Sequence, residues 1–253
     1  MIAAPEPADL PQPRAFVLAG GQSSRMGRDK SQLLLGGVTL LEHGVRRLRA
    51  LGFAAAVAGL RAGALPPFGT PVVADAFEEC GPLGGMEAAL RSLASLPAQP
   101  VLFVAVDLPL LPAALLEQLW QRALCTGALA TVPYLVGRPQ PLCAVYHSSL
   151  AAGFAEALAR EDRKIMRVLE SLVPLDRFDR FRVEALAATH QEQPAAGPMS
   201  FTHAWFANAN TPEDWQRIVS ASDPGVQSFV PGCTGHGLHA SIAAVPAEGG
   251  DAQ

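Results

Sequence analysis

Short apolar segments alternate with amphipathic segments through the first half of the chain, and few folds accommodate such an alternation. Ala15–Ala19 is apolar throughout and stops at a pair of glycines, as a strand buried on both faces does. Between Thr39 and Leu51 the apolar residues instead recur at helical spacing. Val101–Val106 is the clearest buried strand of the sequence. This β-α-β-α-β order predicts an α/β domain with a mainly parallel central sheet, helices on both of its faces and right-handed crossovers.

The same patterns place the remaining elements and the limits of the domain. Further strands are expected at Phe53–Leu60, Pro71–Ala74, Leu129–Tyr134, Leu142–Tyr146 and Trp205–Ala209, and further helices at Gly84–Leu93, Ser149–Arg160 and Lys164–Leu172. Glu184–Ser200 is expected to form a long surface loop. After about Ser220 the sequence is rich in Gly, Pro, Ser and Ala, which is typical of a loosely ordered tail. We therefore expect a flexible lead at residues 1–13, one domain at 14–220 and a loosely ordered tail at 221–253.

Composition excludes several classes of protein. The chain is 49% hydrophobic and 17% charged, against roughly 25% charged in an average globular protein, so it can bury a large core. Its net charge of −4 is the opposite of what binding to DNA or RNA requires. No apolar run approaches the roughly 18–20 residues of a membrane helix, the start is unlike a signal peptide, and the cysteines form no C-x-x-C pair. We expect a cytoplasmic protein that contacts neither nucleic acid nor membrane.

A glycine-rich loop between Leu18 and Lys30 follows the first expected strand. Gly20 and Gly21 let the backbone approach an anion and point successive N–H groups at it, and Arg25 and Lys30 add positive charge. The spacing matches neither the P-loop nor the G-x-G-x-x-G dinucleotide motif. The loop therefore indicates a phosphate cradle of another kind, with a plain turn beside a solvated basic cluster as the alternative.

Asp107 comes directly after the most hydrophobic strand, at the edge of an open α/β sheet where ligands bind. A carboxylate at this place suits Mg²⁺, which prefers one or two carboxylates together with water and substrate phosphates. The alternative is that Asp107 caps the N-terminus of a helix, since Asp is a frequent N-cap and a proline follows two residues later.

Asp75 also ends an expected strand, and a glycine- and proline-rich turn follows it. The turn Gly81-Pro82-Leu83 opens a helix whose free N–H groups would face an anion or the edge of a base. A plain turn into a helix is the alternative.

Four segments in order resemble the motifs of nucleotidyltransferases, and in particular those of the molybdenum cofactor guanylyltransferases. They are the loop Leu18–Lys30, the segment Val72–Asp75 with Gly81–Met86, the Asp-x-Pro of Val106–Pro109, and the Asn-x-Asn-Thr-Pro-Glu-Asp of Phe206–Asp214. Together they span roughly residues 15–217. The resemblance implies a three-layer Rossmann-like nucleotidyltransferase fold and a Mg²⁺-dependent transfer of GMP from GTP to the terminal phosphate of molybdopterin that carries molybdenum.

The resemblance also implies roles for individual residues. Catalysis is expected to depend on Lys30 at the α-phosphate, Arg25 at the β- and γ-phosphates, and Asp107 as the metal ligand. The residues expected to contact the nucleotide are Leu18, Ala19, Gly20, Gly21, Lys30, Asp75, Gly81, Pro82, Leu83 and Asp107. One departure stands at Leu60, where the family usually has an Asn that contacts the nucleotide, so this contact is expected to be missing or moved.

By the same resemblance, the pterin is expected to contact Gln140, Asn208 and Asn210. In a strand the two asparagines would point to one face, while an Asx-turn followed by a helix N-cap at Thr211 also explains them, and both explanations can hold together. The acceptor molybdoenzyme or its chaperone is a further expected partner.

Two other functions are compatible with these motifs. A cytidylyltransferase for the same pterin, or a sugar-phosphate nucleotidyltransferase, would use the same chemistry with another nucleotide. A non-catalytic carrier or chaperone would hold the pterin and pass it to a target enzyme, because a fold alone does not establish catalysis.

Overall fold

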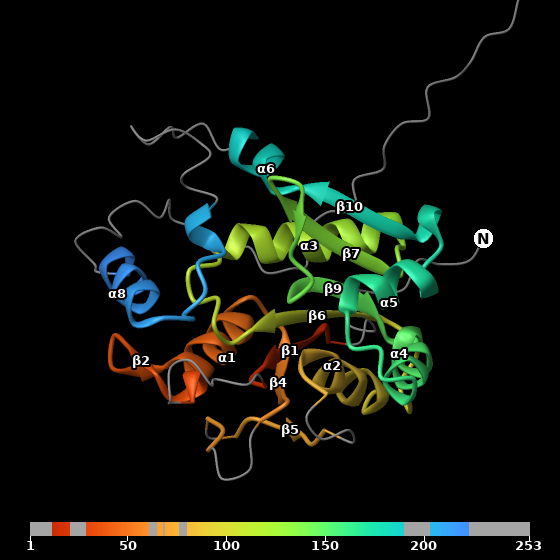
Figure 1. The fold of residues 1–253 in the computed structure, drawn as a ribbon, viewed down its shortest axis with the longest axis horizontal. Coiled ribbons are helices and arrows are strands. Elements are labelled where there is room, and N and C mark those ends of the chain that lie inside the picture. The colour runs from red at the N-terminus through yellow and green to blue at the C-terminus, as the bar shows by residue number, and fades with distance from the viewer. Residues whose placement is uncertain are drawn as a thin grey trace, which may run out of the picture.

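The computed structural model describes residues 12–20, 29–60, 65–67, 69–75, 80–189 and 203–222, and an eight-stranded sheet lies at their centre (Figure 1). The strands follow the order β10-β7-β9-β6-β1-β4-β5, and β8 pairs with β7. They are β1 (Arg14–Leu18), β4 (Ala54–Ala58), β5 (Val72–Val73), β6 (Pro100–Ala105), β7 (Ala130–Leu135), β8 (Arg138–Pro139), β9 (Cys143–His147) and β10 (Phe178–Arg182). Strands β5, β4, β1 and β6 are parallel, as are β7 and β10, while β9 is antiparallel to β6 and β7. The prediction of a mainly parallel sheet is confirmed.

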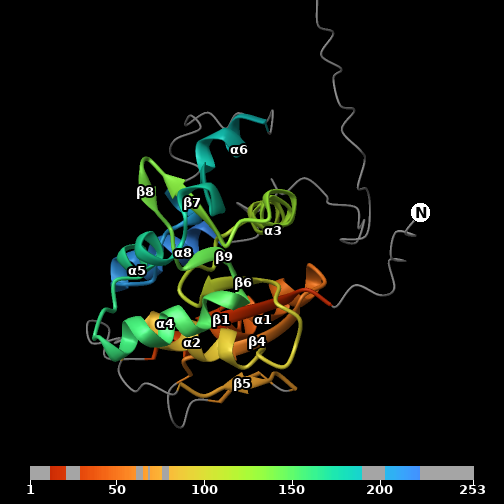
Figure 2. The ribbon, with the colours of Figure 1, turned by 90° about the vertical axis from the view of Figure 1, so that its right-hand side faces the viewer.

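Helices cover both faces of this sheet, so the expected three layers are also confirmed. They are α1 (Leu40–Ala50), α2 (Pro82–Arg91), α3 (Ala113–Thr126), α4 (Ala151–Ala159), α5 (Ile165–Leu172), α6 (Val183–Thr189) and α8 (Pro212–Ala221). In β1, Ala15 and Val17 belong to the core beneath α1 and α3, whereas Phe16 and Leu18 belong to the core beneath α2, α4 and α5. Figure 2 shows α3 on one side of the sheet and α4 and α5 on the other. None of these described helices combines the length and apolar character that crossing a bilayer requires.

Helix α1 illustrates how the sequence sets the bounds of an element. Its N-cap is Thr39, whose Oγ1 accepts a hydrogen bond from the backbone of Glu42 at 3.1 Å. Its buried face carries Leu41, Val45 and Leu48 against the sheet. Before it, a short hairpin joins β2 (Leu34–Leu35) to β3 (Val38–Thr39).

Two expectations for the last third of the chain are wrong. Trp205–Ala209 is not a strand: residues 203–205 are helical, and the N–H of Ala207 turns back to the carbonyl of Ala204 at 3.1 Å. Its apolar residues are buried because they pack onto the α1 and α3 side of the core, not because they pair in the sheet. The expected loop Glu184–Ser200 begins inside helix α6, which forms because Val183 is fully buried and Leu186 packs against the same core.

Candidate active site

The carboxyl ends of β1, β4 and β6 lie next to one another at one edge of the sheet. Leu18, the last residue of β1, pairs with Ala58 of β4 and Ala105 of β6. The backbone N–H of Val106 donates to the carbonyl of Leu18 at 3.0 Å, which continues the pairing beyond β6. Segments that leave these strands, among them the one with Asp107, therefore emerge at a shared edge, where open α/β sheets bind ligands.

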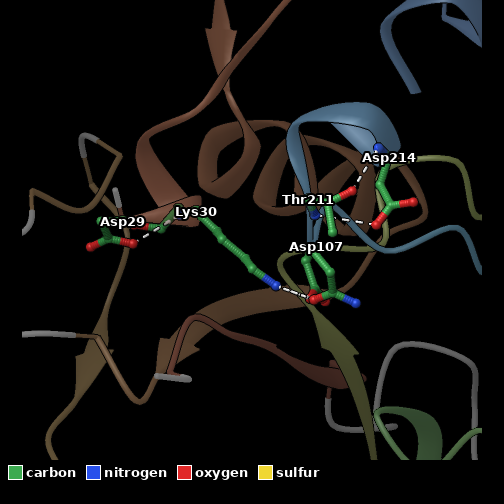
Figure 3. Close-up of polar contacts among 7 residues, drawn as sticks. Asp29, Lys30, Asp107, Thr211 and Asp214 are labelled. Carbon is green, nitrogen blue, oxygen red and sulfur yellow. Dashed lines mark hydrogen bonds and ion pairs between the residues drawn. The ribbon is translucent and has the colours of Figure 1, made fainter. Parts of the chain in front are cut away.

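Three polar side chains from distant parts of the sequence meet at this edge. The ammonium Nζ of Lys30 donates to Asp107 Oδ2 at 3.0 Å and to Asn210 Oδ1 at 2.5 Å (Figure 3). The side chains of Lys30 and Asp107 are 17% and 20% exposed, so they are shielded from bulk water yet open to a ligand. An ammonium and a carboxylate placed together in this way provide one group for a phosphate and one for a divalent cation.

Lys30 is held in place by the residues around it in sequence. It begins a short 3-10 helix, η2 (Lys30–Gln32), whose N-cap is Asp29. The carboxylate Oδ1 of Asp29 accepts a hydrogen bond from the backbone N–H of Ser31 at 2.9 Å (Figure 3). Ser31 is fully buried, so η2 is fixed to the core and Lys30 points to the sheet edge.

Asp107 lies in a turn between β6 and α3 and does not cap a helix. The alternative of an N-cap is wrong, because α3 begins six residues later with Pro112 as its N-cap. Instead, the turn is held from α1: Arg47 donates to the carbonyl oxygens of Leu108, Pro109 and Leu111 at 3.1, 2.9 and 2.9 Å. The Asp107 carboxylate faces Lys30, which donates a hydrogen bond to it.

Asn210 reaches Lys30 from the segment that precedes α8. The backbone N–H of Ala209 donates to the carbonyl of Asp107 at 3.3 Å, which joins this segment to the turn after β6. Thr211 then caps α8 in a capping box with Asp214, as one of the two sequence explanations predicts (Figure 3). Because this segment is not a strand, the shared face that a strand would give is not formed: Asn208 is exposed, and of the two asparagines it is Asn210 that contacts Lys30.

Asp75 lies in a tight arrangement of glycines beside the end of β4. Gly59 has a φ of +71°, and a Cβ built on it would lie 3.1 Å from the backbone nitrogen of Gly20 and 3.7 Å from Asp75 Oδ2. Burial raises the pKa of Asp75 above its ordinary value; the backbone hydrogen bond from Gly59 lowers it, and the charge of Glu87 raises it. Only residues without a side chain allow the backbones of Gly20 and Gly59 to approach each other so closely beside this carboxylate.

The turn Gly81-Pro82-Leu83 starts α2 as expected. Gly81 is the N-cap with a φ of +66° and makes no side-chain cap, and Pro82 occupies the first helical turn. The side chain of Leu83 is fully buried, as are those of Leu18 and Ala19 to within a few per cent. Any contact of these residues with a ligand would therefore use their backbone.

The structure leaves two of the predicted residues without a test, and a third lies near the same edge with its side chain hydrogen-bonded within its own segment. Gly21 and Arg25 lie outside the described residues. Gln140 lies just before β9, close to the end of β6, because the N–H of Ala105 donates to the carbonyl of Leu142 at 2.8 Å. Its side-chain amide donates to the carbonyl of Arg138 at 3.4 Å.

Sequence reasoning did not identify Arg47 or Gly59. Arg47 belongs to a run of arginines on α1 that reads as a solvated face, but at 100° per residue it lies only about 20° from the buried Leu40 around the helix. This position at the margin of the apolar stripe is the signal that would have found it. Gly59 follows a strand, and nothing in the sequence indicates its contact with Gly20.

Comparisons with known sequences agree on one family. The model described as "MobA-like NTP transferase domain" matches residues 15–178. A "Probable molybdenum cofactor guanylyltransferase" of Opitutus terrae is 36% identical over 202 residues, which cover 79% of this chain and 92% of that protein. A "Molybdenum cofactor guanylyltransferase" of Rhizobium meliloti is 36% identical over 223 residues, covering 85% and 93% of the two chains.

Solved structures share the fold. A "Molybdopterin-guanine dinucleotide biosynthesis protein A" of Archaeoglobus fulgidus matches 82% of this chain and 97% of its own with a TM-score of 0.65 and 24% identity. A "2-C-methyl-D-erythritol 4-phosphate cytidylyltransferase" of Thermus thermophilus matches 83% and 98% with a TM-score of 0.56 and 21% identity. At these identities the likeness establishes the shared fold.

Proposed function

This chain belongs to the MobA-like NTP transferase family, and from that membership we propose that it transfers GMP from GTP to the terminal phosphate of molybdopterin that carries molybdenum. The observation that carries this proposal is the cluster of Lys30, Asp107 and Asn210 at the sheet edge, since it offers a cation and a carboxylate to one nucleotide. Relatives that are 36% identical over more than nine-tenths of their own length have guanylyltransferase names, which favours GTP over CTP as the donor.

Mg²⁺ fits the residues at this edge. Among the described residues no group of three or more His, Cys, Asp and Glu gathers, so a metal that needs a full protein cage is not suited to the site. Mg²⁺ requires less, because it is bound through one or two carboxylates while water and substrate phosphates complete its octahedron. Asp107 would hold it, and the ion would neutralise charge on the phosphates of GTP.

In this reaction the chain mainly positions the two substrates and neutralises the charge on the phosphates. An oxygen of the pterin phosphate attacks the α-phosphorus of GTP, the bond from that phosphorus to the β-phosphate oxygen breaks, and pyrophosphate leaves. The attacking oxygen is already ionised, so no side chain has to accept a proton. The Lys30 ammonium balances the charge at the α-phosphate, and the glycine loop with Arg25 binds the leaving phosphates.

The contacts of Lys30 suggest how it changes partners. In the structure its ammonium is shared between the carboxylate of Asp107 and the amide oxygen of Asn210. A phosphate oxygen would compete with Asp107 for this ammonium and leave the carboxylate to the metal, while Asn210 would keep Lys30 at the edge. Gln140 and Asn208, which lie at or near the same edge, would contact the pterin, and the product would pass to a molybdoenzyme or its chaperone.

The test is pyrophosphate release by the full chain with molybdenum-loaded molybdopterin, Mg²⁺ and either GTP or CTP. Lys30→Ala and Asp107→Ala are each expected to lower turnover at least about 100-fold, because each removes a charge that the transition state needs. Both side chains are partly exposed, so their loss is expected to leave the circular dichroism spectrum and the cooperative unfolding transition in place.

The three candidate functions predict different results in this assay. A guanylyltransferase releases pyrophosphate with GTP and far less with CTP. Preference for CTP would instead establish a cytidylyltransferase, and a carrier would release none with either nucleotide. Near-normal turnover in either alanine variant would show that the catalytic group lies elsewhere.

A further inference from the structure

Arg47 places a charged side chain behind the turn that carries Asp107. Its two terminal nitrogens donate to three carbonyl oxygens, those of Leu108, Pro109 and Leu111, at distances between 2.9 and 3.1 Å. These residues follow Asp107 directly and belong to no helix or strand, so their carbonyls have no partner within regular structure. One side chain of α1 therefore fixes most of the turn between Asp107 and α3.

Burying the charged guanidinium of Arg47 at this place costs desolvation free energy. Its Nε atom is buried without a hydrogen-bond partner, and among the ion pairs of the described residues none includes this guanidinium. Burial lowers the pKa of Arg47 to about 10, so the side chain is still charged at neutral pH. Carbonyl dipoles, not a carboxylate, compensate it. An apolar residue would pack at this margin of the helix without that cost, which indicates that the three hydrogen bonds serve the turn.

The same helix also holds Lys30. The N–H of Leu40, the first residue of α1, donates at 2.8 Å to the carbonyl of Leu33, which directly follows the 3-10 helix that Lys30 begins. Helix α1 is thus bound at its start to the segment of Lys30 and, about two turns later, to the turn of Asp107. The distance between the two charged side chains is set through this helix.

We propose that Arg47 is the positioning residue for Asp107: it holds the turn 108–111 so that the Asp107 carboxylate faces Lys30 and is ready for the metal-bound nucleotide. Its effect on nucleotide binding rests on the proposed function, whereas its effect on the Lys30 and Asp107 pair does not. Replacing a residue that orients a metal ligand through hydrogen bonds commonly changes metal affinity about 10- to 100-fold.

Lys30 itself offers a readout that needs no nucleotide. Lys30 and Lys164 are the two lysines of the sequence, and Lys164 is exposed, so it serves as an internal reference. In trace labelling with acetic anhydride, followed by mass spectrometry, Lys30 of the natural chain should react more slowly than Lys164, because its side chain is shielded and hydrogen-bonded. Arg47→Met, which removes the three donors and keeps similar volume, should raise the labelling of Lys30 several-fold relative to Lys164.

Arg122→Met is the matched control. Arg122 is also a partly buried arginine that joins two elements, since it donates to both carboxylate oxygens of Asp179 between α3 and β10. Its loss should lower stability in the same way and leave the labelling of Lys30 unchanged. Arg47→Lys keeps the charge but has a single nitrogen for three carbonyls, so it should give an intermediate labelling ratio and provides a second variant if Arg47→Met does not fold.

Calorimetry with GTP then separates the inference from the function. Arg47→Met is expected to weaken binding of GTP with Mg²⁺ about 10-fold and to change binding of GTP in EDTA little, while Arg122→Met changes neither. Unchanged labelling of Lys30 in Arg47→Met and Arg47→Lys would overturn the proposal, as would equal weakening of GTP binding with and without Mg²⁺. Increased labelling in a chain that binds no GTP would support the role of Arg47 and refute the proposed function.

Discussion

Asp107 shows how many separate contacts define the position of one carboxylate. Its Oδ2 accepts from Lys30, its backbone carbonyl accepts from Ala209, and the carbonyls that follow it accept from Arg47. These donors come from three segments that are not adjacent in sequence. The contacts of the chain itself therefore orient the carboxylate, and this would reduce the reorganisation that ligand binding requires.

The close approach of Gly59 to Gly20 can be tested by substitution. Replacing Gly59 with Ala places a Cβ at a φ of +71°, which costs about 1–2 kcal/mol of stability, and brings that Cβ to 3.1 Å from the Gly20 nitrogen. The backbones at the ends of β1 and β4 must then move apart, beside Asp75. We expect Gly59→Ala to lower the melting temperature and to raise the KM for GTP.

Gly127 provides the control for this substitution. It caps the C-terminus of α3 with a φ of +61°, and a Cβ there would meet no atom within 4 Å. Gly127→Ala should therefore carry a similar backbone cost without any change in the KM for GTP. If the two variants have equal KM values, the close approach of Gly20 and Gly59 has no part in nucleotide binding.

The residues that could be predicted are those whose function is tied to a strand end. Asp107 follows a buried strand and Asp75 follows the short strand β5, and the carboxyl ends of parallel strands meet at one edge, so their placement follows from the pattern. The contact of Asn210 with Lys30 could not be predicted, because it depends on where a segment without regular structure crosses that edge. Arg47 was missed for a related reason, since its partners are backbone carbonyls, which have no sequence signature.

Among the elements, α8 lies outside the sheet and fixes the position of Asn210. Its buried Ile218 and the partly buried Trp215 anchor it to the core on the α1 and α3 side. Its capping box fixes its first turn, and Asn210 stands immediately before that turn. The position of Asn210 thus depends on whether α8 is docked and capped.

Thr211→Val tests this dependence. The substitution keeps the shape of the side chain but removes the Oγ1 acceptor for the Asp214 amide, which costs about 1 kcal/mol of helix stability. We expect faster hydrogen exchange in the first turn of α8 and a lower kcat, because Asn210 holds Lys30 less firmly. Thr211→Ser retains the acceptor and should keep both properties of the natural chain; if the valine variant did so too, the cap would be irrelevant to the site.

Most elements could be predicted from apolar patterns, but helix α3 and strand β10 were not predicted, and the two wrong expectations have different causes. A buried apolar run indicates a strand only where a neighbouring strand is available to pair with it, and the segment around Trp205 is buried against helices instead. In α6, the residues Glu184–Ala188 are good helix formers and Val183 and Leu186 pack against the core, so the expected loop was started several residues too early. Around Trp205 tertiary packing decided the local structure, and the sequence window does not contain that information.

At the scale of the molecule, the antiparallel strand β9 brings the second half of the chain to the site. It lies between β6 and β7 and runs opposite to both, so its beginning, not its end, is at the edge where β6 ends. The residues before it, Gln140 among them, thereby reach the same edge as Asp107. The half of the sheet that carries the glycine loop and the half that carries Gln140 meet there.

A truncation tests the proposed extent of the domain. Helix α8 ends at Ala221, and Ser222 donates its backbone N–H and its hydroxyl to the carbonyl of Ile218. All the groups of the cluster precede this point. We expect a chain that ends at Ser222 to release pyrophosphate with the kcat and KM of the full chain; a large loss of either would place a needed residue between 223 and 253.

The three groups that meet at this edge are widely separated along the chain: Asp107 is 77 positions from Lys30, and Asn210 is 180 positions from Lys30. Closing loops of this length costs conformational entropy that local helices and hairpins do not repay, so such contacts form late. Turnover should consequently return after the far-ultraviolet signal during refolding. Turnover therefore indicates that the fold is complete. A chain in which α8 has undocked should lack turnover while most of its secondary structure persists.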